Sequence, residues 1–279
     1  MEHVFVRDLV EATGGKLLCG DPEASVARIK LDSRQVESGD LFVPIIGERV
    51  DGHKFIPQVL DLGAAAVLTS EHDEVPEECS KGAWIRVEDT KAALQDIGRY
   101  LRARLSLPLV GVTGSVGKTT TREMIAAALS AKYRVYKTPG NSNSQVGVPI
   151  TISEIREQDE IGVIELGMSE PGELTVIAKI AKIDMAVITN IGITHIEQLG
   201  SRENIYKEKM TIQDGLREHG VLLNEASAVA YDSRQKKVVK VGNEAKDMLG
   251  RTPSYIDVIY PLRDGVIADF HMTEIMLKS

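Results

Sequence analysis

The chain has 279 residues, of which 43% are hydrophobic and 27% charged, a composition typical of a folded protein with a sizeable core. Its formal net charge of -8 argues against nucleic-acid binding, which needs clustered cations, and favours a small molecule or a protein as partner. No run reaches the roughly 18 apolar residues of a membrane span, and the amino-terminal segment lacks the uninterrupted apolar core of a signal peptide. We therefore expect a cytoplasmic protein.

The two cysteines, Cys19 and Cys79, are far apart and lack the spacing of metal ligands. Neither a disulfide framework nor a zinc site is expected, and two reduced thiols fit a cytoplasmic chain.

The first part of the chain alternates short apolar runs with turn signals. Strand-like segments at 41–46 and 65–70 flank a helical stretch near 55–62. The pattern predicts a small α/β domain over residues 1–88.

An amphipathic segment follows at 89–107 and predicts a linker helix. Asp89 or Thr90 is its expected cap, and Pro108 follows its end.

Residues 108–220 predict a second α/β domain, in which strands alternate with helices. That alternation is typical of a parallel sheet with crossover helices. The strand-like segments are 109–114, 161–167 and 184–192, and the helical ones are 119–133 and 174–182.

The segment TGSVGKTTT follows an apolar strand and opens a helix. Such a turn presents backbone N–H groups and a positive helix end to an anion, Lys118 adds a mobile charge, and the Thr119 hydroxyl suits magnesium. Val112 stands where the usual phosphate loop has its first glycine, so a chance surface turn is the alternative. The residues predicted to bind the nucleotide are Thr113, Gly114, Ser115, Val116, Gly117, Lys118, Thr119 and Thr120.

Two further polar residues, Glu165 and His195, lie at the ends of predicted strands. Because α/β sheets bind ligands at the carboxyl ends of their parallel strands, both are candidate metal ligands beside the phosphate loop. The alternatives are a solvated turn acid for Glu165 and a structural histidine for His195.

A guanine-nucleotide switch would need an Asn-Lys-x-Asp element to read the base. The nearest candidate, 181–184, has alanine in place of the asparagine, so this class of protein is not favoured.

Several motifs in order resemble the Mur ligase family, specifically the members that add D-alanyl-D-alanine to UDP-N-acetylmuramoyl-tripeptide. They are the phosphate loop, TPGNSNSQVGVP at 138–149, ELG at 165–167 and TNIGITHIEQLGSRENI at 189–205. The block at 31–68 resembles the uridine-nucleotide domain of those ligases, so the resemblance covers about residues 1–220.

The resemblance implies an ATP-dependent amide ligation in peptidoglycan synthesis, with ATP and Mg²⁺ required. The γ-phosphoryl group of ATP passes to the peptide carboxylate, and the amine of D-alanyl-D-alanine then attacks the acyl phosphate. Such a reaction needs charge neutralisation around the γ-phosphate and alignment of the two reactants.

Carried over by motif, Lys118 holds the β and γ phosphates, Thr119 and Glu165 bind magnesium, and His195 binds a second magnesium ion. Lys209 matches a lysine that is carbamylated in related ligases, and its alternative is a solvated helix lysine. Lys118, His195 and Lys209 are thus the catalytic candidates.

The substrate side of the resemblance places Asn141 or Asn143 on the path to the peptide. Ser33, Arg34 and parts of the segment 47–53 would contact the uridine nucleotide, with a plain Asp-Ser turn as the alternative.

Residues 221–279 instead resemble a fragment of the MreB-type bacterial actin homologues, most specifically at 244–253 and 261–270. The fragment lacks that family's glycine-rich phosphate loop, so it is assigned no ATP site, and its alternative is a segment that only supplies apolar strands. The predicted fold class is therefore α/β throughout: a small domain, an incomplete parallel-sheet ATP-binding domain and a short actin-like α/β fragment.

In the family, the central domain continues further and a C-terminal domain binds the incoming dipeptide. We therefore expect weak nucleotide binding and no complete ligation by residues 1–279 alone. The rival hypothesis is a non-catalytic scaffold that recognises the precursor and contacts actin-like filaments through 221–279.

Overall fold

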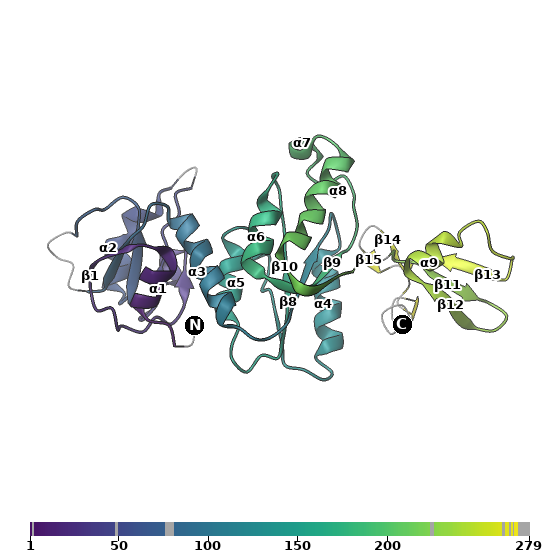
Figure 1. The fold of residues 1–279 in the computed structure, drawn as a ribbon, viewed down its shortest axis with the longest axis horizontal. Helices are drawn as coiled ribbons and strands as arrows, with labels where there is room; N and C mark the ends of the chain where they lie inside the picture. Colours follow the sequence, from purple (N-terminus) through teal and green to yellow (C-terminus); the bar gives the residue numbers. More distant parts are fainter. Residues whose placement is uncertain are drawn as a thin grey trace.

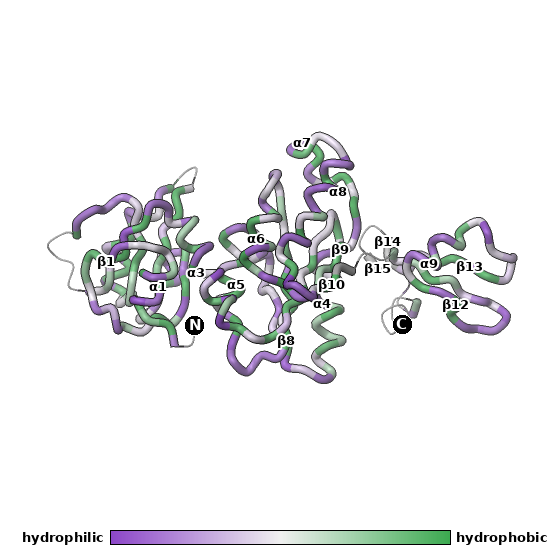
Figure 2. Tube along the Cα trace, viewed as in Figure 1, coloured by the Kyte–Doolittle hydropathy of each residue, from purple (hydrophilic) through white to green (hydrophobic). Residues whose placement is uncertain are grey.

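The computed structural model describes residues 1, 3–47, 50–75, 81–223, 226–263, 266–267, 269 and 271–272. Figure 1 shows three successive units along an elongated molecule, coloured purple to blue, teal to green and yellow-green. Hydrophobic segments lie inside these units, and polar segments follow many of the outer loops (Figure 2).

The first unit is a five-stranded sheet in the order β1-β5-β4-β3-β2. All neighbouring pairs are parallel except β1 with β5. The strands are β1 (Lys16–Cys19), β2 (Ile29–Lys30), β3 (Leu41–Phe42), β4 (Ala66–Thr69) and β5 (Ala83–Arg86), and the helices are α1 (Val6–Thr13) and α2 (Ile56–Asp61).

The strand expected over 41–46 is shorter than predicted, because it ends at Phe42. Pro44 has no N–H to donate to a ladder. Beyond it the chain turns, and the Gly52 N–H donates to the Ile45 carbonyl at 3.1 Å. The helix expected near 55–62 is confirmed as α2, and the strand at 65–70 as β4.

The second unit is a five-stranded sheet in the order β10-β9-β6-β8-β7, and all its pairs are parallel. The expected parallel sheet is therefore confirmed. Its strands are β6 (Leu109–Thr113), β7 (Val135–Lys137), β8 (Ile161–Glu165), β9 (Ile183–Ile188) and β10 (Leu216–Leu223).

Helices cover both faces of this sheet. One face packs against α4 (Lys118–Leu129), whose Ala126 is buried against Val110 and Val163. The other face shares a core with α5 (Gly147–Glu154) and α6 (Glu173–Ala181). The short α7 (Ile196–Leu199) and α8 (Arg202–Met210) follow β9 and lie at the top of Figure 1.

The predicted linker helix is α3 (Thr90–Arg104), and Asp89 is its cap, accepting from the N–H groups of Lys91 and Ala92. Its buried side chains belong to one hydrophobic core that also contains Leu9 of α1 and Ile177 of α6. The helix therefore joins the first two units through shared packing.

Arg102 fastens the end of α3 to the start of β9. Its side chain is fully buried and donates to three carbonyls, those of Ala181 at 2.7 Å, Lys182 at 2.9 Å and Leu105 at 3.0 Å. A fourth bond, 3.3 Å long, reaches the carboxylate of Asp184. Burial, followed by the repulsion of Arg217, lowers the pKa of Arg102 to about 10.

The third unit contains a three-stranded antiparallel sheet in the order β12-β11-β13. Ala228, Ala230 and Ala245 form its small core, separate from the larger ones. Its elements are β11 (Val229–Asp232), β12 (Lys237–Val241), α9 (Gly242–Asp247) and β13 (Ile256–Ile259), followed by the pair β14 (Leu262–Arg263) and β15 (Val266–Ile267).

The expected boundary after residue 220 falls inside β10. This strand pairs with β9 on both sides of that position, Leu216 with Ile183 and Val221 with Met185. The sheet of the second unit therefore extends into the segment that was expected to begin the third.

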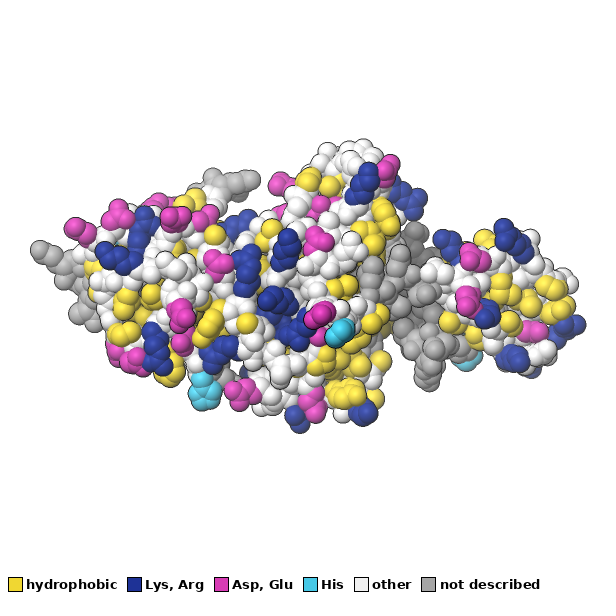
Figure 3. Space-filling view, viewed as in Figure 1, with side chains coloured by type: hydrophobic (Ala, Val, Ile, Leu, Met, Phe, Trp, Pro, Cys, Tyr) yellow, Lys and Arg dark blue, Asp and Glu magenta, His cyan; other side chains and the backbone are white. Residues whose placement is uncertain are grey.

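No helix among the described ranges is long and apolar enough to cross a membrane. On the face drawn in Figure 3, Lys and Arg side chains gather over the middle unit. Cys79 lies outside the described residues, so the expectation of two reduced thiols stays a prediction.

Arg102→Ala is expected to lower the free energy of unfolding by about 3 kcal/mol, because a fully buried side chain and its hydrogen bonds to three carbonyl groups are lost. The measurement is urea unfolding followed by circular dichroism. Arg99→Ala is the matched control, since Arg99 is on the same helix but its side chain is 41% exposed. Equal unfolding midpoints for the two variants would contradict the anchoring role of Arg102.

Candidate active site

The predicted phosphate loop joins β6 to α4 through two glycines in unusual backbone conformations. Gly114 has φ +150° and Gly117 has φ +81°. A Cβ atom added to Gly114 would lie 1.9 Å from the Thr189 hydroxyl, so no other residue fits there. Val112, the departure from the usual pattern, is a fully buried β6 residue paired with Glu165 and Val187. The turn therefore begins later than the usual pattern places it.

The end of β9 holds this loop from the side. The N–H groups of Ser115 and Val116 donate to the carbonyl and side-chain oxygens of Asn190, at 3.1 and 3.0 Å. The Thr189 hydroxyl donates to the Val116 carbonyl at 2.6 Å. Sequence reasoning missed Asn190, although its position near the carboxyl end of the strand predicted over 184–192 was a usable signal.

The amino end of α4 is the part of the loop that can bind an anion. Gly117 is its N-cap, and no side-chain cap is found there among the described residues. The first N–H groups of a helix have no partner inside it, so Lys118, Thr119 and Thr120 offer amides to a phosphate. The Lys118 ammonium donates to the Gly114 carbonyl at 3.0 Å. Burial lowers the pKa of Lys118, and Glu165 opposes that shift.

Glu165 is buried at the end of β8, with 2% of its surface exposed. Its carboxylate accepts from the Thr119 hydroxyl at 3.0 Å and from the Asn143 amide at 2.8 Å. Its backbone N–H donates to the Thr138 hydroxyl at 2.9 Å. The alternative of a solvated turn acid is therefore wrong, and nucleotide binding by the loop stays a prediction.

Thr119 and Glu165 provide a donor set that fits magnesium. Both present hard oxygen atoms, the ligand type that Mg²⁺ prefers, and both lie beside the helix end where the phosphates of a nucleotide would bind. His195 offers nitrogen, a ligand better suited to other metals. Its assignment to a second magnesium ion stays a prediction.

His195 and Lys209 lie within electrostatic reach of Lys118. His195 is half-buried, with φ +63°, before α7. Burial is the largest cause that lowers its pKa, followed by the charges of Lys209 and Lys118. The structure thus brings the three catalytic candidates to one region.

Lys209 is 2% exposed on α8, so the alternative of a solvated helix lysine is wrong. Burial, followed by the charge of Lys118, lowers its pKa to about 8, and Glu208 opposes that shift. The carboxylate of Glu208 accepts from the N–H groups of Gly172 and Leu174, at 2.9 and 3.3 Å. Glu208 thereby fastens α8 to the amino end of α6.

Of the four predicted substrate-binding residues, all of which the structure describes, only Asn143 contacts the group around Glu165. Asn143 contacts Glu165, whereas Asn141 is exposed in the preceding turn. Ser33 and Arg34 belong to the first unit (Figure 1), in a short turn capped by Asp32. Ser33 is buried, and Arg34 forms an ion pair with Asp32 at 2.6 Å. The Asp-Ser turn therefore exists, and nucleotide contact stays a prediction.

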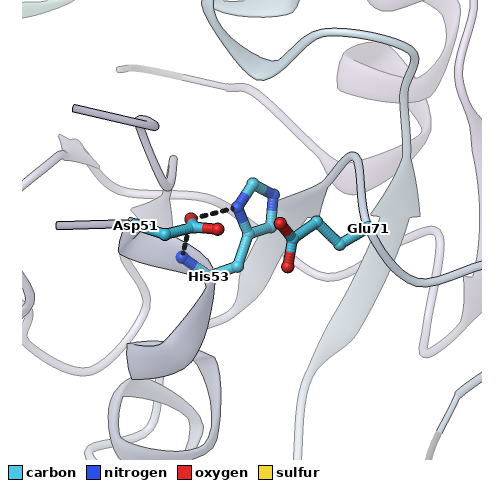
Figure 4. A group of neighbouring side chains, drawn as sticks. All are labelled: Asp51, His53 and Glu71. Atoms are coloured by element: carbon cyan, nitrogen blue, oxygen red, sulfur yellow. Dashed lines mark hydrogen bonds and ion pairs between the residues drawn. The ribbon is translucent and has the colours of Figure 1, made fainter. Parts of the chain in front are cut away.

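A group of three potential metal ligands occurs in the first unit, formed by Asp51, His53 and Glu71 (Figure 4). The Ser70 N–H donates to His53 Nε2 at 3.0 Å, so Nδ1 carries the hydrogen and donates to Asp51 at 2.7 Å. A metal on Nδ1 would need the opposite tautomer and would lose the Ser70 bond. The group is therefore assigned a structural role.

That role concerns the segment 47–53, which was expected to contact the uridine nucleotide. Asp51 also accepts from the His53 backbone N–H at 2.9 Å, and this bond is the main cause that lowers the pKa of Asp51. The group fixes the end of the segment against β4. Residues 48 and 49 lie outside the described residues.

Comparison with protein families agrees with this geometry. Residues 112–260 match the Mur ligase middle domain, and residues 25–102 match the description "Mur ligase family, catalytic domain". The chain belongs to the Mur ligase family. The middle-domain match extends past residue 220, and the comparisons give no support to an actin-like origin of 221–279.

Two curated relatives from this family are UDP-N-acetylmuramoyl-tripeptide–D-alanyl-D-alanine ligases. The chain is 43% identical over 219 residues to that of Bacillus subtilis (strain 168), covering 78% of this chain and 48% of the relative. It is 32% identical over 228 residues to that of Escherichia coli (strain K12), covering 81% and 48%. The chain spans about half the length of these relatives.

Solved structures of the same ligases have the same fold. MurF from Acinetobacter baumannii aligns with a TM-score of 0.72 at 34% identity, over 78% of this chain and 48% of that one. MurF ligase from Thermotoga maritima, in complex with ADP, aligns with a TM-score of 0.64 at 37% identity, over 71% and 45%.

Lys209→Met is expected to raise the free energy of unfolding at pH 7 by about 1 to 3 kcal/mol, because it removes a buried ammonium group. The free energy of unfolding of wild type should rise toward that of the variant as the pH increases from about 8 to 10.5. In this range folded Lys209 has released its proton, whereas unfolded Lys209 still binds it. The measurement is urea unfolding across this pH range.

Lys207→Met is the matched control, because Lys207 lies on the same helix with a side chain 65% exposed. It should leave the free energy of unfolding nearly unchanged at every pH. A Lys209→Met variant less stable than wild type at pH 7 would mean that the ammonium has a compensating partner.

Proposed function

We propose that this chain carries the nucleotide-binding and precursor-binding parts of an ATP-dependent amide ligase of peptidoglycan synthesis. The substrates are UDP-N-acetylmuramoyl-tripeptide and D-alanyl-D-alanine, and the site of the reaction is cytoplasmic. Support comes from the names of the relatives and from the ADP complex of the Thermotoga maritima ligase. Filament contact through 221–279 has no such support and forms no part of the proposal.

The reaction has two steps. An oxygen of the tripeptide carboxylate attacks the γ-phosphorus of ATP, the bond to ADP breaks, and an acyl phosphate forms. The amine of D-alanyl-D-alanine then attacks the acyl carbon, phosphate leaves with the bonding electrons, and the amine loses a proton. Both steps require neutralisation of phosphoryl charge and exclusion of water.

In the first step, the amino end of α4 and the Lys118 ammonium bind the phosphates. The Lys118 ammonium donates to the Gly114 carbonyl, so its charge lies at the loop where the phosphates would bind. Thr119 and Glu165 would hold Mg²⁺, which shields the phosphate oxygens when bound. The observation that carries the proposal is this pairing of a buried carboxylate with a helix-start hydroxyl, 3.0 Å apart, beside an uncapped phosphate loop.

In the second step, His195 and Lys209 would act close to Lys118 and the phosphates, and Asn141 and Asn143 would line the path of the peptide. With a pKa of about 8, Lys209 is a neutral amine for a larger fraction of the time than an ordinary lysine. A neutral amine can add carbon dioxide. The carbamate forms with release of one proton and presents an oxygen anion in place of the ammonium. Ser33 and Arg34 would bind the uridine nucleotide.

The test is calorimetric titration of the chain with a non-hydrolysable ATP analogue and magnesium, for wild type and Lys118→Ala. Wild type should bind saturably, and the substitution should weaken binding by more than about tenfold, because a charge-assisted contact to phosphate is lost. Lys132→Ala, an exposed lysine after the end of the same helix, is the control.

A second titration uses UDP-N-acetylmuramoyl-tripeptide. Binding of the precursor without the nucleotide would support the first unit as the uridine-nucleotide domain. A folded chain that binds neither ligand would reject the proposed function.

A further inference from the structure

Arg122 is a buried cation that directly contacts the proposed magnesium ligand. It lies on α4 three residues after Thr119, so both side chains project from one face of the helix toward Glu165. Its guanidinium NH1 is 3.4 Å from Glu165 Oε2, the same oxygen that accepts from the Thr119 hydroxyl at 3.0 Å. Arg122 is 4% exposed and Glu165 is 2% exposed.

The carboxylate of Glu165 is thereby neutralised without any metal. Oε2 accepts from Thr119 and Arg122, and Oε1 accepts from Asn143 at 2.8 Å. Lys118 adds a second positive charge within electrostatic reach of the same carboxylate. The Glu165 carboxylate therefore faces two cations, Arg122 and Lys118.

Arg122 also has a second acidic partner, Glu123, which it shares with Lys137. NH1 donates to the Gly140 carbonyl at 2.9 Å, and NH2 donates to Glu123 at 2.7 Å. The Nε atom is buried and has no hydrogen-bond partner within the described part of the chain.

We propose that Arg122 is a positioning residue that keeps Mg²⁺ off Glu165 until a nucleotide is bound. This inference rests on the proposed function, because it concerns the same phosphate and magnesium site. The site then takes a nucleoside triphosphate together with its divalent cation. The metal alone binds weakly, because Arg122 occupies the Glu165 carboxylate.

The physical reason is the charge balance of the site. A divalent cation that arrives alone meets the Arg122 and Lys118 cations at short range, and repulsion in a buried site is weakly screened. A triphosphate brings several negative charges, which compensate both cations and leave Glu165 free to share Oε2 with the metal. The two ligands must then favour each other's binding by the same factor.

Arg122 has a second role through Gly140. The same guanidinium group that contacts Glu165 holds the segment 138–143, which carries Asn143. A change in the Arg122–Glu165 contact when metal enters would therefore be transmitted to the proposed peptide path.

The test is calorimetry with Mg²⁺ alone, with a non-hydrolysable ATP analogue alone, and with both, on the full 279-residue chain. Wild type should bind Mg²⁺ alone only weakly. Arg122→Gln should bind Mg²⁺ alone on the order of tenfold more tightly than wild type. The factor by which the nucleotide increases the affinity for Mg²⁺ should fall by the same amount.

Two further variants separate charge from structure. Arg122→Lys keeps the charge, and should resemble wild type in its weak binding of Mg²⁺ alone. Arg99→Gln removes the same charge from α3, which packs against α5 and α6 on the side of the sheet away from α4, and should change nothing. Thermal unfolding checks each fold, and Arg122→Met serves as the charge-loss variant if Arg122→Gln unfolds.

The proposal is overturned if the charge-loss variant binds Mg²⁺ alone no better than wild type, or if Arg122→Lys gains affinity as much as Arg122→Gln. Absence of nucleotide binding in every variant would reject the proposed function. The titration with Mg²⁺ alone would still decide the role of Arg122, so the two failures are distinguishable.

Discussion

The second unit is organised around one buried ionised group, the Glu165 carboxylate. A carboxylate removed from water needs hydrogen-bond donors, and here they come from α4 and from the segment after β7. Each donor fixes its own element against the end of β8. The requirement to satisfy one charge thus aligns the phosphate loop helix with the segment proposed to meet the peptide.

The phosphate loop itself is preorganised by contacts that involve no ligand. Asn190 and Thr189, at the end of β9, bind the backbone of Ser115 and Val116 on one side. The amides that remain for a phosphate are those at the start of α4. A site whose dipoles are already oriented loses little free energy to reorganisation when charge develops, which is the condition for electrostatic catalysis.

Much of this arrangement could be predicted from the sequence, because it depends on local pattern. The parallel sheet, the phosphate loop and the placement of Glu165 at a strand end follow from apolar runs, glycines and strand polarity. The burial of Lys209 and the contacts of Arg122 and Asn190 depend on tertiary packing, which no spacing of residues encodes. The extension of β10 past residue 220 was missed for the same reason, since strand pairing with β9 is a long-range contact.

Neighbouring side chains on α8 point to different partners, and this restricts how the helix can move. Glu208 binds the amino end of α6, and the next residue, Lys209, is within reach of Lys118. Rotation of α8 about its own axis would break the first contact whenever it changed the second. Because α6 is packed in the core of the second unit, the contacts of Glu208 hold α8, and with it Lys209, at a fixed place relative to the sheet.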